Sequence, residues 1–325
     1  MWPFRRRKPP GAANVPSLTI DPAMGDETAK RLIAASGAGD WRTIAELLSA
    51  VEDPDDHTFY VHRVAWAGGV ENWIDDWVAA EPRSALPLLV KGAHAIDWAW
   101  EARGGGRANT VSREAFKIFF KRLKLAEDCL DEVTERDADS ATPWSFLVIL
   151  GRGRQLGVEE TRRRFEEARK RHPWHVEAHE QMLQQLCRKW GGSHEEMHRF
   201  AAETLEAMPA GSPLGQLTAA AHVEHWLDLP RDEDDEYIRS AEIRAELVAA
   251  ANRSILHPEY VRRPRWPTLH NAFAMTFAYS GELAAAAEQF DAIGDLVTEW
   301  PWQYGGRTVE VFLDTRERVF GDLGR

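Results

Sequence analysis

One short segment carries residue types at a spacing that could hold a metal ion. His194, Glu195 and His198 form the pattern His-Glu-x-x-His. In that pattern two histidines on one helix face bind zinc and the glutamate acts as a general base. A zinc peptidase needs a third ligand, for which Glu224 or His225 could be offered. This pattern supports one alternative function, a zinc-dependent hydrolase that uses the two histidines and the glutamate.

The residues around this segment favour a structural interpretation instead. Ser193 and Glu196 have the spacing of a capping box, which places His194 in the first turn of a helix. Gly191 and Gly192 form a turn directly before it. The chain also shows no alternating pattern typical of a β-strand, so it offers no sheet edge to hold a peptide substrate. We therefore expect a capped helix start, with no metal, no cofactor and no catalytic residue.

Tryptophan and arginine provide a second set of candidates. The chain has 14 tryptophans, and most of them lie at helix ends or on apolar stripes, where they would fill gaps between packed helices. Two groups lie beside glycine turns, which would let a ligand approach the backbone. Aromatic and arginine side chains dominate the energetics of protein interfaces. The candidate partner-binding residues are Trp98, Trp100, Arg103, Arg107, Lys189 and Trp190.

Helices must position all of these residues. The pattern is helical almost throughout from residue 22, with Asp40 and Ser112 as expected N-caps. The glycine run 104–106 should end the helix that carries Trp98 and Trp100. Prolines recur after similar amphipathic stretches, and several of their spacings lie near the period of about 34 residues of helix-turn-helix repeats.

The repeat is clearest near the C-terminal end of the chain. Residues 270–290 match the tetratricopeptide template at Phe273, Ala274, Phe277 and Ala286, with a turn glycine between the two helices. Residues 145–173 and 180–209 match it in part. The sequence therefore predicts an all-α fold, an α-solenoid of antiparallel helix hairpins arranged as a tetratricopeptide-like right-handed superhelix.

Two segments resemble a known family. Residues 188–197, Arg-Lys-Trp-Gly-Gly-Ser-His-Glu-Glu-Met, and residues 99–104 followed by Thr110-Val111 are similar to segments of a family of uncharacterised bacterial tetratricopeptide-like helical-repeat proteins with a KWGGS-type segment. The similarity extends over about residues 40 to 230. The resemblance implies a helical-repeat fold and carries no known activity.

Composition limits the function classes. The formal charge of −12 argues against a nucleic-acid-binding protein, because phosphate contacts need a basic face. Cys129 and Cys187 lie within helical patterns, which indicates buried thiols and a cytoplasmic protein. No stretch has the roughly 18 apolar residues of a membrane span.

The first residues form a separate region. Residues 1–21 are expected to be a flexible basic tail rich in proline and glycine, followed by one helical-repeat domain over residues 22–325. Residues 2–8 combine four cations with two aromatic side chains, which could give weak contact with an anionic membrane surface.

The sequence thus predicts a non-enzymatic scaffold that binds a protein or peptide in the concave groove of the solenoid. The zinc hydrolase with His194 and His198 is one alternative, and a receptor for a small signalling peptide is another. The identity of the partner does not follow from these residues.

Overall fold

The computed structural model describes residues 18–104 and 111–325 of the chain. This part of the protein contains sixteen α-helices and no strand, so the predicted all-α class is confirmed. The helices form two compact units. The central unit comprises Asp26–Ser193, and the terminal unit comprises His194–Arg325 together with residues 18–25. The sequence predicts one helical-repeat domain over residues 22–325, and the described helices of that range fall into these two units.

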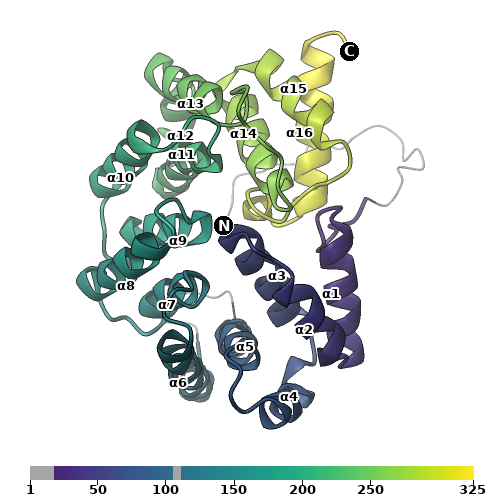
Figure 1. The fold of residues 1–325 in the computed structure, drawn as a ribbon. Helices are drawn as coiled ribbons and strands as arrows, with labels where there is room; N and C mark the ends of the chain where they lie inside the picture. Colours follow the sequence, from purple (N-terminus) through teal and green to yellow (C-terminus); the bar gives the residue numbers. More distant parts are fainter. Residues whose placement is uncertain (1–17, 105–110) are drawn as a thin grey trace. The chain divides into compact units, whose positions relative to one another are not determined.

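The central unit holds nine α-helices. They are α1 (Glu27–Ala38), α2 (Trp41–Ser49), α3 (Pro54–Trp66), α4 (Ile74–Ala80), α5 (Leu86–Arg103), α6 (Arg113–Arg136), α7 (Thr142–Gly153), α8 (Val158–Arg171) and α9 (Val176–Leu186), with the 3-10 turns η1 (Val70–Asn72) and η3 (Arg188–Trp190). Helix α5 packs most extensively on α6 and also contacts α3 and α7 (Figure 1).

Local signals set several of these boundaries as predicted. The carboxylate of Asp40 accepts a hydrogen bond from the backbone N–H of Thr43 at the start of α2. The hydroxyl of Ser112 accepts one from Ala115 at the start of α6. Helix α5 ends at Arg103 because Gly104 adopts a positive φ of 72°, a region that favours glycine.

Helices α5 and α6 run antiparallel. Trp100 near the end of α5 contacts Phe119 near the start of α6, with ring centroids 5.0 Å apart. At the other end of the pair, the guanidinium of Arg136 donates hydrogen bonds to the carbonyl oxygens of Pro82 and Ser84, just before α5 begins. The hairpin therefore brings the last turn of α5 beside the first turns of α6.

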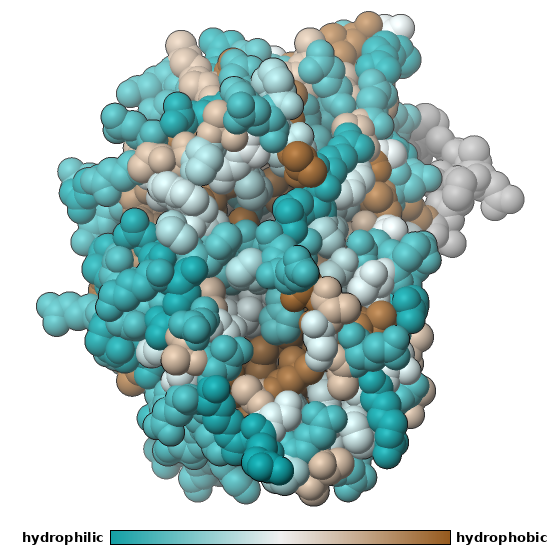
Figure 2. All heavy atoms as spheres, in the orientation of Figure 1, coloured by the Kyte–Doolittle hydropathy of each residue, from teal (hydrophilic) through white to brown (hydrophobic). Residues whose placement is uncertain are grey.

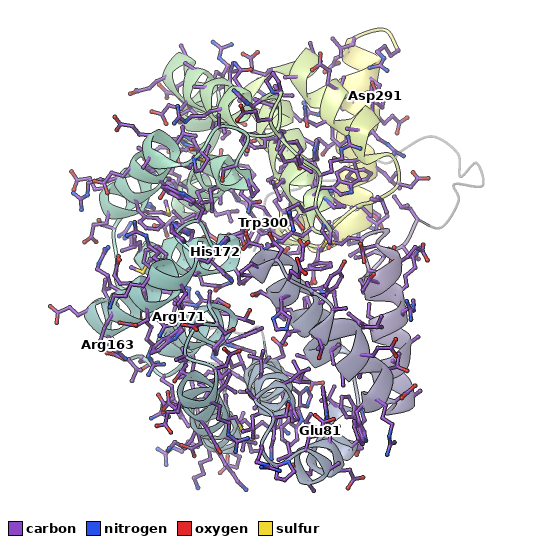
Figure 3. The ribbon with its side chains drawn as sticks, in the orientation of Figure 1. Glu81, Arg163, Arg171, His172, Asp291 and Trp300 are labelled. Atoms are coloured by element: carbon purple, nitrogen blue, oxygen red, sulfur yellow. The ribbon has the colours of Figure 1, made fainter. Side chains whose placement is uncertain are left out.

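Helix α8 has one face exposed to solvent and one face packed against α6. Arg163 projects from its outer face and pairs with Glu160 one turn earlier, at 2.8 Å (Figure 3). On the inner face, the buried Arg164 donates to Glu127 of α6 at 2.9 Å. The surface over α6 and α8 is mostly hydrophilic in Figure 2.

The terminal unit is built around one apolar helix. Its elements are α10 (His194–Ala207), η4 (Pro213–Gly215), α11 (Gln216–Asp228), α12 (Asp234–Ile238), α13 (Ala241–Arg253), α14 (Trp266–Ser280), α15 (Leu283–Ile293), η5 (Trp302–Gly305) and α16 (Thr308–Asp322). Helix α14 contacts α11, α13, α15 and α16 and is buried along nearly its whole length (Figure 1).

The segment before α1 belongs to this terminal unit. Leu18 packs against its apolar core, and the hydroxyl of Thr268 lies 3.5 Å from the sulfur of Met24. Residues 18–21, which the sequence assigns to the tail, therefore lie in a packed unit. Residues 1–17, including the basic segment 2–8, lie outside the described residues. Within residues 18–104 and 111–325 no helix is long and apolar enough to span a membrane.

Candidate functional site

Two tryptophans from distant parts of the sequence meet in the central unit. Trp100 lies in the last turn of α5, and Trp190 lies in η3, which follows α9. Their rings pack edge to face, with centroids 6.0 Å apart and an interplanar angle of 80°. Both side chains are half-buried. The structure thus brings together two of the candidate groups that the sequence singled out separately.

Two arginines flank this ring pair. The guanidinium of Arg103 lies 5.3 Å from the centroid of the Trp100 ring, and that of Arg152 lies 5.6 Å from the centroid of the Trp190 ring. These are cation–π distances. We call Trp100, Arg103, Arg152 and Trp190 the Trp100–Trp190 patch. Arg152 was not a predicted site residue; it lies in the partial repeat 145–173, at a position where the template has an aromatic residue.

Close helix packing supports the patch from beneath. Phe119 of α6 is buried and touches the Trp100 ring edge to face. On the other side, Gly153 ends α7 beside α5. A Cβ at Gly153 would lie 3.0 Å from Leu123 and 3.5 Å from the Trp100 ring. The missing side chain therefore allows α7 to approach α5 and hold Trp100 in place.

Trp98 has different neighbours. The guanidinium of Arg122 lies 3.4 Å from the centroid of its ring and donates a hydrogen bond of 2.5 Å to its carbonyl oxygen. Burial lowers the pKa of that guanidinium. His94 stacks on the Trp98 ring, with centroids 5.8 Å apart. Trp98 therefore makes its contacts with α5 and α6 and is not part of the patch, although it was predicted to share a face with Trp100.

Two predicted candidates remain, Lys189 and Arg107. Lys189 is exposed in η3, next to Trp190. Arg107 lies outside the described residues. Of the six predicted binding residues, the structure brings Trp100, Arg103 and Trp190 into contact and places Lys189 beside them.

The turn that carries Trp190 depends on a glycine. A Cβ at Gly192 would lie 2.1 Å from the carbonyl oxygen of Leu186, which is backbone and cannot move away cheaply. The side-chain amide of Gln185 (Nε2) also donates a hydrogen bond to the carbonyl oxygen of Trp190, at 3.2 Å. The turn is therefore closed tightly against the end of α9.

Substitution Gly192→Ala is expected to displace this turn and to destabilise the central unit by about 2 kcal/mol, because overpacking against backbone is not relieved by rotamer changes. Chemical denaturation followed by far-UV circular dichroism measures the loss. Gly37→Ala is the matched control, since Gly37 lies in α1 with no atom within 4 Å of the added Cβ. An equal loss of stability in both variants would contradict the role of Gly192.

The His-Glu-x-x-His segment opens α10, as the capping interpretation predicts. The Nε2 atom of His194 lies 3.0 Å from a carboxylate oxygen of Asp228, and that of His198 lies 3.0 Å from Nδ1 of His225. Glu195 is exposed.

Of the two side chains offered as a third zinc ligand, His225 lies against His198. Glu224, which was offered as a third ligand, is buried and accepts a hydrogen bond from Tyr304. Across the described ranges, no group of three or more histidine, cysteine, aspartate or glutamate side chains is arranged to hold a metal ion. The zinc-hydrolase alternative therefore has no ligand set in this part of the chain.

Comparison with models of protein families gives no match, and comparison with curated protein sequences gives no significant match. The resemblance to bacterial tetratricopeptide-like proteins therefore remains a prediction that rests on the segments quoted above.

Proposed function

We propose that the protein is a non-enzymatic module that binds a protein or peptide partner, and that the Trp100–Trp190 patch is its anchor site. The contact between Trp100 and Trp190, with an arginine over each ring, carries this proposal. The patch combines half-buried aromatic side chains with guanidinium groups on a compact helical unit. Tryptophan and arginine are the residue types most enriched among side chains that dominate binding energy.

The arrangement of the patch suits binding without chemistry. Each ring is held by its neighbour, so little side-chain freedom would be lost when a partner covers it. Arg103, Arg152 and Lys189 place positive charge around the rings, which favours a partner segment with acidic residues beside an apolar anchor. No nucleophile with an adjacent base forms part of the patch. We further propose that the helix pairs of both units are tetratricopeptide-like repeats of a solenoid, which is the fold that the resemblance implies.

The binding proposal can be tested with the full-length chain. A partner recovered from a lysate of the source cell would be identified by mass spectrometry and its affinity measured by titration calorimetry. Trp190→Ala is expected to weaken binding by roughly 30-fold, because truncation of a central aromatic anchor typically costs 2 kcal/mol or more. Far-UV circular dichroism would verify that the variant is folded.

Trp66→Ala is the matched control for this measurement. Trp66 lies at the end of α3 in the same unit and is 56% exposed, and its ring packs against His62 and Arg63 of its own helix. Its replacement should leave the affinity within about twofold. If Trp66→Ala and Trp190→Ala weaken binding equally, or if neither does, the patch is not the anchor site.

A further inference from the structure

Four imidazoles lie in direct contact in the terminal unit. His194 and His198 come from α10, and His222 and His225 come from α11. The rings of His194 and His225 stack face to face, with centroids 3.9 Å apart and planes 12° apart. The ring centroids of His198 and His222 are 4.8 Å apart. We call these four residues the histidine cluster.

Three further titratable groups face the cluster. The hydroxyl of Tyr237 in α12 lies 2.9 Å from Nδ1 of His222 and 3.3 Å from Nε2 of His198. A carboxylate oxygen of Glu246 in α13 lies 2.9 Å from Nε2 of His222. Asp228, at the end of α11, faces His194. Glu246 thus lies beside His222, and its charge also acts on His198. Asp228 lies beside His194, and its charge also acts on His225.

The contact between His198 and His225 accommodates only one proton. Their Nε2 and Nδ1 atoms are 3.0 Å apart, so one nitrogen must donate and the other must accept. If both rings became imidazolium, two N–H groups would face each other. Protonation of both His194 and His225 would likewise place two positive rings face to face at 3.9 Å.

We propose that the histidine cluster is a proton-sensitive latch that holds α10 against α11 when its rings are neutral and loosens α10 when the pH falls below about 6. The latch works because the rings of His198 and His225 cannot both take up protons while their N–N contact and the stacking of His225 on His194 remain in place. Acidification therefore favours the state in which α10 has moved away and each imidazole can be hydrated.

The pKa values of His198 and His225 are shifted in the direction that this latch requires. Burial, followed by the charges of neighbouring histidines, lowers the pKa of His198 to about 3. The same causes lower the pKa of His225 to about 4. A solvated histidine titrates near 6.5. The open state therefore binds more protons than the closed state below pH 6.5. The stability that the two neutral rings contribute to the closed state is fully present above that pH and falls as the pH drops from 6.5 toward 4.

Hydrogen exchange on the full-length chain tests the latch. Protection factors of the α10 amides would be measured by mass spectrometry at pH 7.2 and pH 5.5, after correction for the intrinsic rate at each pH. We expect protection in α10 to fall by at least about tenfold at pH 5.5, because each proton taken up over one pH unit changes the equilibrium tenfold. Amides in α14 and α15 should keep their protection.

The variant His198→Gln/His225→Asn separates titration from packing. Glutamine can donate from the position of Nε2 and asparagine can accept at the position of Nδ1, so the hydrogen bond is retained without a group that titrates. The pH dependence of α10 protection should disappear in this variant. His257→Asn is the control, because His257 lies in the same unit outside the cluster and its Nδ1 accepts a hydrogen bond from the backbone N–H of Glu259.

Three results would overturn the latch. Protection of α10 that is the same at both pH values in the unmodified protein is the first. An equal loss of protection in the double variant would assign the effect to other groups. Stoichiometric binding of added Zn²⁺ that raises the melting temperature at pH 7.2 would show that the cluster is a metal site.

If the double variant does not fold, histidine NMR titration of the unmodified protein decides the question. The latch requires that two of the four rings stay neutral until α10 opens, and titration of all four near pH 6.5 with α10 still protected would exclude it.

Discussion

Replacing Asn271 with alanine is expected to lower the free energy of unfolding of the terminal unit by about 4 kcal/mol. Asn271 lies in α14 and is fully buried. Its Oδ1 atom accepts a 2.7 Å hydrogen bond from the indole N–H of Trp302. Its Nδ2 group donates to the carbonyl oxygens of Pro267, at 2.8 Å, and Leu296, at 3.0 Å.

The large effect follows from the groups that would be left behind. Trp302 is completely buried against Phe290 and Phe312, so its N–H could not turn to water. The Leu296 carbonyl would also lose its partner. Each buried polar group without a partner costs about 1–3 kcal/mol, and the cavity left by the amide adds to this.

Urea denaturation followed by circular dichroism would measure the change, and hydrogen exchange in α14 would assign it to the terminal unit. Asn252→Ala is the control, since Asn252 is exposed on α13. The prediction fails if Asn271→Ala costs less than about 1 kcal/mol.

The second large effect is expected for Asp55→Ala, which should destabilise the central unit by about 3 kcal/mol. Asp55 lies in the first turn of α3 and accepts a 2.7 Å hydrogen bond from the backbone N–H of Val176, where α9 begins. His172, at the junction of α8 and α9, lies 3.4 Å from the other carboxylate oxygen (Figure 3). Alanine would leave a buried N–H group without an acceptor.

A hydrogen-bonded chain extends the effect of this carboxylate. The Nδ1 atom of His175 accepts from the N–H of Ala178, so its Nε2 can donate to Thr58, 3.0 Å away. Thr58 contacts Thr142 of α7 at 3.1 Å. Helices α3, α7 and α9 are therefore joined by polar contacts that Asp55 helps to align.

Asp55→Asn separates the charge from the hydrogen bond. Burial opposes ionisation of Asp55, but the hydrogen bond with His172 and the interaction with His175 outweigh it and hold the pKa of the carboxyl below its usual value. A lowered pKa means stability that is present above about pH 4 and lost as the pH falls through the folded-state value. The asparagine variant should keep more stability than alanine and show a smaller loss in acid. Equal stability of the alanine and asparagine variants at pH 7 would contradict this account.

Several helix boundaries could be predicted because their causes are local. The caps Asp40 and Ser112 each accept a hydrogen bond from an N–H three residues ahead, and Gly104 ends α5 through its own backbone conformation. Such interactions depend on a few neighbouring residues, so the sequence pattern contains them. The all-α class follows from the same periodicity.

The Trp100–Trp190 patch could be predicted only in part. Glycine turns and residue types marked its two halves, but the contact between them and the position of Arg152 depend on how α5, α7 and α9 pack. Trp98 shows the limit, because its residue type and the nearby glycine turn made it a candidate beside Trp100, and the structure gives it the neighbours His94 and Arg122.

The histidine cluster illustrates the same division. The sequence by itself determined that His194 and His198 lie on one face at the start of a helix, since helical geometry brings residues four apart together. Only the tertiary structure decided what that face meets. The rings of His222 and His225 lie against it, and the carboxylates of Asp228 and Glu246 lie beside His194 and His222. Contacts between helices depend on side-chain volumes and burial across the whole unit, which no short spacing encodes.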